Sequence, residues 1–182
     1  RSGTTGVNGV VLANVAYTLA ESGGPDGYSA GSWACFTDYG TDDAAPFATN
    51  GDQVTLDLDD DVTCVIVNDD IAPKLELVKE VTNDDGGTEL VSAWTLTADD
   101  GGDGADLSGA SGVNGDVKAN VAYTLGESGP DGYSTVGYSC EGTGIVSSGA
   151  YSVTLALGAD ATCTIVNDDI APKLELVKEV TN

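Results

Sequence analysis

The sequence predicts an all-β protein made of tandem small β-sandwiches, with about 100 residues in each repeat. Three observations lead to this fold class. Short stretches alternate apolar and polar side chains, Gly-Gly, Asp-Gly, Asn-Gly and Ser-Gly dipeptides separate these stretches, and a long segment recurs without change. No stretch shows the 3.6-residue apolar period of an amphipathic helix.

The recurring segment defines the domain organisation. Residues 66–83 and 165–182 both read IVNDDIAPKLELVKEVTN, 99 residues apart. A period of this length is that of a self-sufficient domain, whereas solenoid repeats are shorter. We therefore expect residues 1–72 to be a copy that lacks its first strands, 73–171 to be a complete repeat, and 172–182 to be the first strand of a following repeat.

Strands are expected where the alternation is clearest. They are short and rich in β-branched and aromatic residues, and turn-forming dipeptides bound them. The predicted strands of the complete repeat are 74–81, 91–98, 117–127, 151–157 and 161–167.

Composition excludes several classes of function. The chain has 30 acidic and 6 basic residues and a net charge of -24, so it lacks the basic surface that nucleic acid requires. It has no histidine, which removes Ser-His-Asp and Cys-His catalysis and His-containing zinc sites. No apolar run is long enough for a membrane span, so no membrane contact is expected in this segment. Carboxylate pairs alone would remain for an enzyme such as a glycosidase, and a small sandwich rarely holds the deep cleft that it needs. We expect no enzyme with turnover and no cofactor.

Strand parity places three polar residues on apolar faces. Lys79 shares a strand face with leucines and valine, Glu127 continues an apolar row, and Asn167 follows a cysteine and an isoleucine. The first copy repeats the last two positions as Glu21 and Asn68. A single inward charge costs several kcal/mol of desolvation, so we predict that these groups meet inside the fold.

Such a cluster has a definite chemistry. Burial favours the neutral, nucleophilic form of a lysine and the protonated form of a glutamate. Lys79 would then attack the Asn167 carboxamide while Glu127 polarises the carbonyl and moves protons, and loss of ammonia would leave an isopeptide bond. The alternative is structural: the lysine amine reaches water at a strand edge, the glutamate ends a strand, and the asparagine caps a turn.

At these residues the chain resembles a known family. The order LELVKEV, then YTLGESGPDGY with its E-x-x-P-x-G-Y piece, then a last strand ending in asparagine is similar to the collagen-adhesin B-type or SpaA-type prealbumin-like (transthyretin-like) domains of bacterial surface proteins and pili. The resemblance implies a prealbumin-like or Ig-like sandwich, a spontaneous bond between Lys79 and Asn167, and an autocatalytic helper role for Glu127. It differs from the family in its cysteine pair and its acidity. The corresponding positions of the partial copies are Glu21, Asn68 and Lys178.

The four cysteines predict disulfides. Each copy has one pair at equivalent places, Cys35 with Cys64 and Cys140 with Cys163. Disulfides form in oxidising compartments, which predicts an extracellular or cell-surface location. Zinc is the alternative, but two sulfurs per copy without histidine make a poor zinc site.

Two groups of aspartates raise the question of calcium. Neither has the ligand spacing of an EF-hand loop, and the second copy does not keep the first group. We favour a solvated anionic coat, with ordered calcium as the alternative, and predict no metal site. The groups are Asp57, Asp59, Asp60 and Asp61, and Asp99, Asp100, Asp103 and Asp106.

These features predict a structural protein: a tandem-repeat extracellular stalk, fibre or filament whose repeats contact identical repeats or subunits head to tail. The alternative is an adhesin that binds a glycan or protein through the loop after Trp33 or through residues 142–149. Lys178 is expected beside a copy of the Asn68 strand, within one long chain or by donation of residues 173–180 between subunits.

Overall fold

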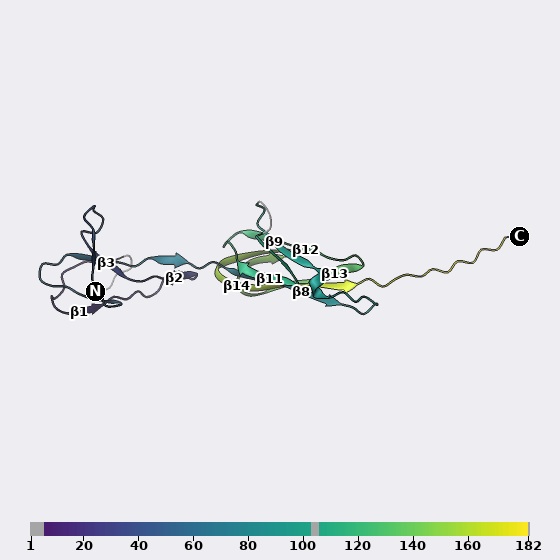
Figure 1. Ribbon diagram of the computed structural model, residues 1–182, viewed down its shortest axis with the longest axis horizontal. Coiled ribbons are helices and arrows are strands. Elements are labelled where there is room, and N and C mark those ends of the chain that lie inside the picture. Colours follow the sequence, from purple (N-terminus) through teal and green to yellow (C-terminus); the bar gives the residue numbers. More distant parts are fainter. Residues whose placement is uncertain (1–5, 103–105, 182) are drawn as a thin grey trace. The chain divides into compact units, whose positions relative to one another are not determined.

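The computed structural model describes residues 6–102 and 106–181. The chain divides into two compact units, Arg1–Asp69 and Asp70–Asn182, which are described separately below (Figure 1). The described residues are strands joined by turns and loops, with one short 3₁₀ turn, η1 (Val91–Ala93), so the all-β prediction is confirmed. Within those residues no helix is long and apolar enough to cross a membrane.

The second unit holds one connected set of seven strands. Six follow the order β10-β9-β12-β14-β8-β11, and β13 pairs with β14. The pairs are antiparallel except that β8 runs parallel to β14. The strands are β8 (Lys74–Thr82), β9 (Thr95–Asp99), β10 (Leu107–Ala110), β11 (Gly112–Asp116), β12 (Ala122–Ser128), β13 (Tyr133–Gly149) and β14 (Ser152–Asp169).

The long strand β14 belongs to both faces of the sandwich-like unit. Its residues 152–154 pair with β12, whereas residues 160–168 pair with β8. Between them Gly158 has a φ of 66°, a backbone conformation that glycine adopts without steric cost. The strand therefore changes direction there and closes the two faces around one core.

The core consists of buried residues from five strands, β8, β9, β10, β12 and β14. Every second side chain from Val153 to Leu155 and again from Ala159 to Asp169 is buried on β14, as the period of two requires. Trp94 adds the largest buried side chain, 2% exposed. The other core residues include Leu75, Leu77, Leu96, Ala98, Tyr123, Leu125, Cys163 and Ile165.

The first unit has smaller sheets and a more open core. Its sheets are β4-β3-β6, β1-β5 and β2-β7. Among its described residues, only Cys35 and Val54 are buried apolar side chains. Its strands are β1 (Ala16–Thr18), β2 (Tyr28–Ala30), β3 (Ala34–Thr37), β4 (Ala45–Phe47), β5 (Gln53–Thr55), β6 (Val62–Val65) and β7 (Asn68–Asp70).

Two of the predicted strands are interrupted by turns. Residues 91–98 are not one strand, because η1 occupies the start and β9 begins at Thr95. Residues 117–127 are also not one strand: Asn120 takes a φ of 58° in a turn, and β12 starts after it. In both places a local turn interrupts an alternation that looked continuous.

A third correction concerns predicted breaks. Residues 152–157 and 161–167 belong to one strand, β14, because Gly158 bends the backbone while β13 pairs with β14 on both sides of it, with a register shift at the bend. Residues 142–149, predicted as a recognition loop, are the second half of β13 and pair with β14. The strand predicted at 74–81 is confirmed as β8.

Candidate cross-link site

Lys79 lies on the inner face of a central strand. β8 is flanked by β14 and β11, and its alternate residues Leu75, Leu77 and Lys79 are buried. Lys79 is 4% exposed, and its side chain has no exposed surface. The amine therefore does not reach water, contrary to the structural alternative that the sequence left open.

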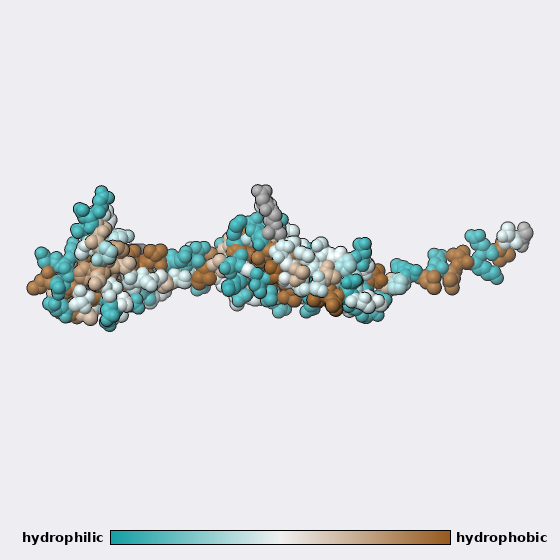
Figure 2. Space-filling model, in the orientation of Figure 1, coloured by the Kyte–Doolittle hydropathy of each residue, from teal (hydrophilic) through white to brown (hydrophobic). Residues whose placement is uncertain are grey.

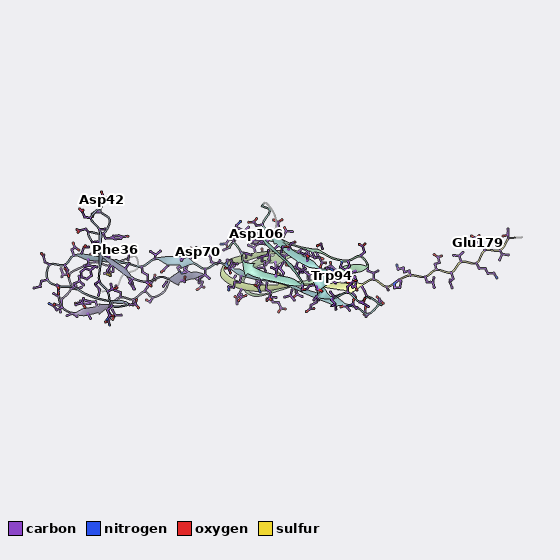
Figure 3. The ribbon with its side chains drawn as sticks, viewed as in Figure 1. Phe36, Asp42, Asp70, Trp94, Asp106 and Glu179 are labelled. Carbon is purple, nitrogen blue, oxygen red and sulfur yellow. A yellow bond between two sulfur atoms is a disulfide. The ribbon has the colours of Figure 1, made fainter. Side chains whose placement is uncertain are left out.

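Three groups surround the amine. The Lys79 Nζ lies 3.1 Å from Glu127 Oε2 and donates a hydrogen bond to the Ile165 carbonyl oxygen, also at 3.1 Å. It also lies 5.3 Å from the centre of the Trp94 ring, within the range of a cation–π contact. Figure 3 labels Trp94 among the packed side chains of this unit.

Burial controls the protonation of this lysine. Desolvation lowers the pKa of Lys79 below its ordinary value of 10.5, and the hydrogen bond and charge of Glu127 offset part of this decrease. The net direction is downward, so the fold favours the neutral, nucleophilic amine more than water does.

Glu127 is held from both sides. It lies near the end of β12, opposite Leu96 of β9, and its side chain is 15% exposed. Thr135 Oγ1 donates a 2.6 Å hydrogen bond to Oε1, while Oε2 faces the lysine. The carboxyl group is therefore positioned between a hydroxyl donor and the amine.

Asn167 completes the row on β14. It is 4% exposed, and its Oδ1 is buried without a hydrogen-bond partner among the described residues. In the parallel pair Ile165 lies opposite Lys79, so Asn167 lies two residues further along the same face. The predicted inward direction of all three polar residues is thus observed, and the Lys79–Glu127 contact is direct.

The buried row contains the chemical groups of an amide-forming reaction, with Lys79 and Glu127 in direct contact and Asn167 two residues beyond the partner of Lys79 on β14. It contains a buried amine nucleophile, a carboxyl group within proton-transfer distance, and a carboxamide whose oxygen has no competing donor. None of these groups needs a metal or cofactor for that reaction.

The first unit has the acid and the amide without the lysine. Asn68 Nδ2 donates a 2.7 Å hydrogen bond to Glu21 Oε1, and both residues are exposed. They line a cavity of about 340 Å³ together with the Ser22–Tyr28 loop. Residues 1–73 contain no lysine, and Lys178 lies in a segment outside this unit.

Both predicted disulfides are present. Cys35 bonds to Cys64 across β3 and β6, and Cys140 bonds to Cys163 across β13 and β14. In each case the two cysteines are direct partners in an antiparallel pair. The described chain has no free cysteine, so the zinc alternative is wrong.

Sequence reasoning missed two supports of the site. Trp94 packs over the amine, and Gly129 allows this because a Cβ there would lie 2.3 Å from the indole ring. Trp94 lies between η1 and β9 rather than inside the strand predicted over 91–98, and the sequence pattern did not indicate what its indole contacts. The sequence also did not indicate that Thr135 contacts Glu127, because a single threonine among many hydroxyl residues forms no recognisable motif.

Within the part of the chain that the structure describes, carboxylates of three aspartates lie close together at two places. Asp99, Asp100 and Asp106 lie close together, and Asp100 forms an ion pair with Lys118. Asp103 lies outside the described residues. In the other predicted group, Asp60 accepts a hydrogen bond from the Asp57 backbone.

The second gathering was not predicted. It joins Asp84, Asp85 and Asp169, and Asp169 accepts backbone N–H groups of Asp84, Asp85 and Gly87. These bonds, led by that of Gly87, lower the pKa of Asp169. The carboxylate thereby holds the turn after β8 against the end of β14.

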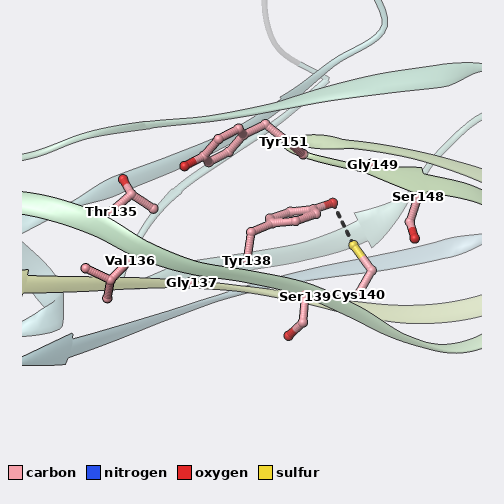
Figure 4. Close-up of a pocket in the computed structure, with 10 residues that line it drawn as sticks. Thr135, Val136, Gly137, Tyr138, Ser139, Cys140, Ser148, Gly149 and Tyr151 are labelled. Atoms are coloured by element: carbon pink, nitrogen blue, oxygen red, sulfur yellow. Dashed lines mark hydrogen bonds between the residues drawn. The ribbon is translucent and has the colours of Figure 1, made fainter.

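An open groove of about 610 Å³ lies along β13. The rings of Tyr138 and Tyr151 are 5.6 Å apart and tilted by 40°, and the Tyr138 hydroxyl contacts Cys140 Sγ (Figure 4). The same hydroxyl donates to the Ser152 carbonyl. Of the residues predicted as recognition loops, only Ser148 and Gly149 line this groove, and the loop after Trp33 does not contribute to it.

The fold, the disulfides and the buried polar row together define the class of protein. It is a β-sandwich module of the kind found in surface and pilus proteins, and its disulfides fit an oxidising environment. The family model SpaA_2, described as the prealbumin-like fold domain, matches residues 1–66 and 70–165, and the chain belongs to this family. Comparisons with curated proteins and with solved structures gave no match.

Proposed function

We propose that this chain is part of an extracellular stalk, fibre or filament whose repeats are stabilised by disulfides and by a Lys79–Asn167 isopeptide bond. The observation that carries the proposal is the buried Lys79 amine 3.1 Å from Glu127. A buried charged lysine is costly in a small domain, and a covalent amide removes that cost permanently. The chemistry is a single autocatalytic event with no turnover.

The reaction conserves atoms without an added reagent. The neutral Nζ of Lys79 attacks Cγ of Asn167, and a new N–C bond forms as the C–Nδ2 bond breaks. Glu127 takes a proton from the attacking amine and delivers it to the departing nitrogen, which leaves as ammonia. Trp94 shields the site from water, which would otherwise solvate the amine.

The bond would join the two strands through which the repeat connects to its neighbours. β8 follows the 71–73 linker, and β14 precedes the identical linker. A covalent bond between Lys79 and Asn167 would link these two strands directly. Tension along the chain would then pass through this bond and would not unfold the rest of the core. This is the property that a stalk requires.

The test is the intact mass of the folded full-length chain. After full reduction of the disulfides, we expect a mass lower than the sequence mass by one ammonia. Peptide mapping should find the Lys79 and Asn167 peptides joined as one branched product. A full sequence mass in correctly folded protein would overturn the proposal.

Variants separate the roles of the three residues. Lys79→Arg and Asn167→Ala should each abolish the mass loss, and Glu127→Gln should slow it strongly. Glu21→Gln is the matched control for Glu127→Gln, because Glu21 is the corresponding residue in a unit without lysine. It should leave the bond at Lys79 unchanged.

An adhesin is the second candidate, and the Tyr138–Tyr151 groove favours it. Aromatic faces beside glycine and serine are suited to sugar or peptide contact. A glycan and protein-binding array with the wild type and Tyr151→Ala tests this function. Binding that Tyr151→Ala abolishes would support an adhesin, and no binding would leave the structural role alone.

A further inference from the structure

We propose that Thr135 is a positioning residue of the cross-link site. Its hydroxyl holds Oε1 of Glu127, so that Oε2 alone carries protons between the Lys79 amine and the Asn167 carboxamide. The contact between Thr135 and Glu127 is part of the folded structure. Its role in bond formation rests on the isopeptide chemistry proposed above.

Glu127 contacts the two strands that flank the strand carrying Asn167. In the sheet, β14 lies between β8 and β13. Oε2 of Glu127 lies 3.1 Å from the amine of Lys79 on β8, and Oε1 accepts the 2.6 Å hydrogen bond from Thr135 on β13. The carboxyl group is therefore held across β14, which carries Asn167 between the two strands.

Thr135 is also the direct cross-strand partner of Asn167. The antiparallel register of β13 and β14 sets these two residues opposite each other. Directly opposite residues of an antiparallel pair have Cβ atoms about 4.5–5.5 Å apart. The hydroxyl that holds the acid thus belongs to a residue beside the carboxamide, and not to a remote part of the fold.

The pairing of β13 with β14 is irregular next to Thr135. Thr135 pairs with Asn167, and the next pair joins Gly137 to Val166. Two steps along β13 therefore correspond to one step along β14, which makes Val136 the extra residue of a β-bulge. Val136 is 60% exposed, and Figure 4 shows it on the side of β13 opposite to Thr135.

The bulge determines which way Thr135 points. Beyond the bulge, Tyr138 and Cys140 are half-buried, and the disulfide to Cys163 fixes their face of the strand. An unbroken alternation from Cys140 back along β13 would turn Thr135 to the outside. The extra residue shifts the alternation by one position. Thr135 and Cys140 therefore both point inward, and one strand serves both the disulfide and the cross-link site.

The surroundings of this hydroxyl differ from those of a surface hydroxyl. Much of the visible face of the second unit carries hydrophilic and intermediate residues, teal and white in Figure 2, and hydroxyl groups there can bond to water. Thr135 is half-buried, and its hydroxyl has a carboxylate oxygen as its partner. Hydrogen bonds to a charged acceptor are about twice as strong as neutral ones, so this contact restrains the Glu127 side chain.

The contact gives each carboxylate oxygen one task. Oε1 bonds to the Thr135 hydroxyl, and Oε2 faces the Lys79 amine. In the reaction Oε2 accepts the proton that Nζ loses as it attacks Cγ of Asn167, and it delivers that proton to Nδ2, which leaves as ammonia. Thr135 keeps its own proton, so the balance of the reaction is unchanged. Without the hydroxyl the carboxyl group can rotate, and Oε2 is aligned with the amine for a smaller fraction of the time.

The test compares two substitutions that remove different parts of Thr135. Thr135→Val keeps the β-branched shape and removes the hydroxyl, whereas Thr135→Ser keeps the hydroxyl and removes the methyl group. Full-length chains are made by cell-free synthesis, and their intact mass after reduction is followed over time. We expect Thr135→Val to slow ammonia loss by about 10- to 100-fold, and Thr135→Ser to remain within about threefold of the wild type.

Thr143→Val is the matched control, because it makes the same change at an exposed residue of the same strand and should leave the rate unchanged. A role in packing alone would give the opposite order, with Thr135→Ser slower than Thr135→Val. That order, or a Thr135→Val rate equal to the wild-type rate, would overturn this inference and leave the proposed bond intact. A wild type of full sequence mass would instead contradict the proposed function, and the role of Thr135 in the reaction with it.

A second measurement tests whether Thr135 acts through the Glu127 carboxylate. In Asn167→Ala, which cannot form the bond, Thr135→Val should raise the unfolding equilibrium constant about tenfold or more, because a hydrogen bond to a charged group is lost. In Asn167→Ala/Glu127→Gln, where the acceptor is neutral, the same substitution should have a clearly smaller effect. Urea unfolding monitored by Trp94 fluorescence gives both values. Equal effects in the two backgrounds would show that Thr135 does not act through the carboxylate.

Discussion

Lys79 lies directly opposite Ile165 in the parallel β8–β14 pair and donates its amine hydrogen to the Ile165 carbonyl oxygen at 3.1 Å. The amine thus stays inside the sheet sandwich instead of extending to solvent. Glu127 and Trp94 complete its surroundings. The lysine in this apolar row is thus paired with a carboxylate, a carbonyl oxygen and an indole ring, and the proposed bond to Asn167 depends on these contacts.

Removing the lysine should destabilise the second unit. Lys79→Met leaves Glu127 without its cation and prevents the proposed bond to Asn167, so we expect a loss of about 3 kcal/mol or more in unfolding free energy. Urea unfolding monitored by Trp94 fluorescence measures it. Lys118→Met, at an exposed ion pair with Asp100, is the control and should change stability much less. Equal losses in the two variants would contradict a special role for Lys79.

The site should respond to pH in a defined direction. The folded pKa of Lys79 lies below 10.5, so between the folded pKa and 10.5 the unfolded state binds more protons. Stability should therefore rise with pH across this window in Asn167→Ala, which cannot form the bond. The double variant Lys79→Met/Asn167→Ala should lack this rise. In the wild type, the rate of ammonia loss should increase with pH until the lysine is neutral.

Gly129→Ala should displace the Trp94 ring that lies over the Lys79 amine. The new methyl group would overlap the Trp94 ring, with its Cβ 2.3 Å from two ring atoms, and overpacking of this kind costs about 1–3 kcal/mol. Displacing the indole should also slow bond formation, which timed intact-mass measurements record. Ser128→Ala, at the exposed neighbouring residue, is the control. An unchanged rate in Gly129→Ala would show that Trp94 does not shield the reaction.

The disulfides should stabilise their units to a similar degree. The disulfides close loops of 29 and 23 residues. Because each bond restricts the unfolded chain, we expect each to raise the unfolding free energy by about 3–4 kcal/mol. Denaturant unfolding of Cys35→Ala/Cys64→Ala and of Cys140→Ala/Cys163→Ala measures the two values. A change below 1 kcal/mol in either would indicate that strand pairing alone constrains that unit.

Two adjacent aspartates should show opposite pH effects. Backbone N–H groups, led by that of Gly87, lower the pKa of Asp169, so its stabilisation is present above 3.8 and is lost as pH falls through the lower folded value. The pKa of Asp168 is raised, first by burial and then by the nearby charges of Asp84 and Asp169. At neutral pH the ionised Asp168 carboxylate therefore destabilises the folded state. At pH 7, Asp169→Asn should lower the melting temperature and Asp168→Asn should raise it. The same sign for both would contradict this assignment.

The sequence by itself determined much of this protein. Alternation placed β8 correctly and pointed Lys79, Glu127 and Asn167 inward, because a period of two leaves only two faces. Equivalent positions in two copies paired Cys35 with Cys64 and Cys140 with Cys163, since a repeated domain repeats its contacts. The family followed from the same residues and is shown by the match to both parts of the chain.

Only the tertiary structure decided how these pieces meet. An alternating sequence pattern does not indicate whether a glycine ends a strand or bends it. The continuity of β14 through Gly158 follows from β13, which pairs with β14 on both sides of that glycine. A sequence pattern also does not indicate contacts between side chains that are distant in sequence. The contact of the Trp94 ring with the Lys79 amine and the hydrogen bond from Thr135 to Glu127 are therefore known only from the packing of the strands. The side of the sheet to which a side chain points depends only on the strand that carries it. The residues that the side chain contacts depend on how several strands pack together, and for this physical reason the sequence predicts the first and not the second.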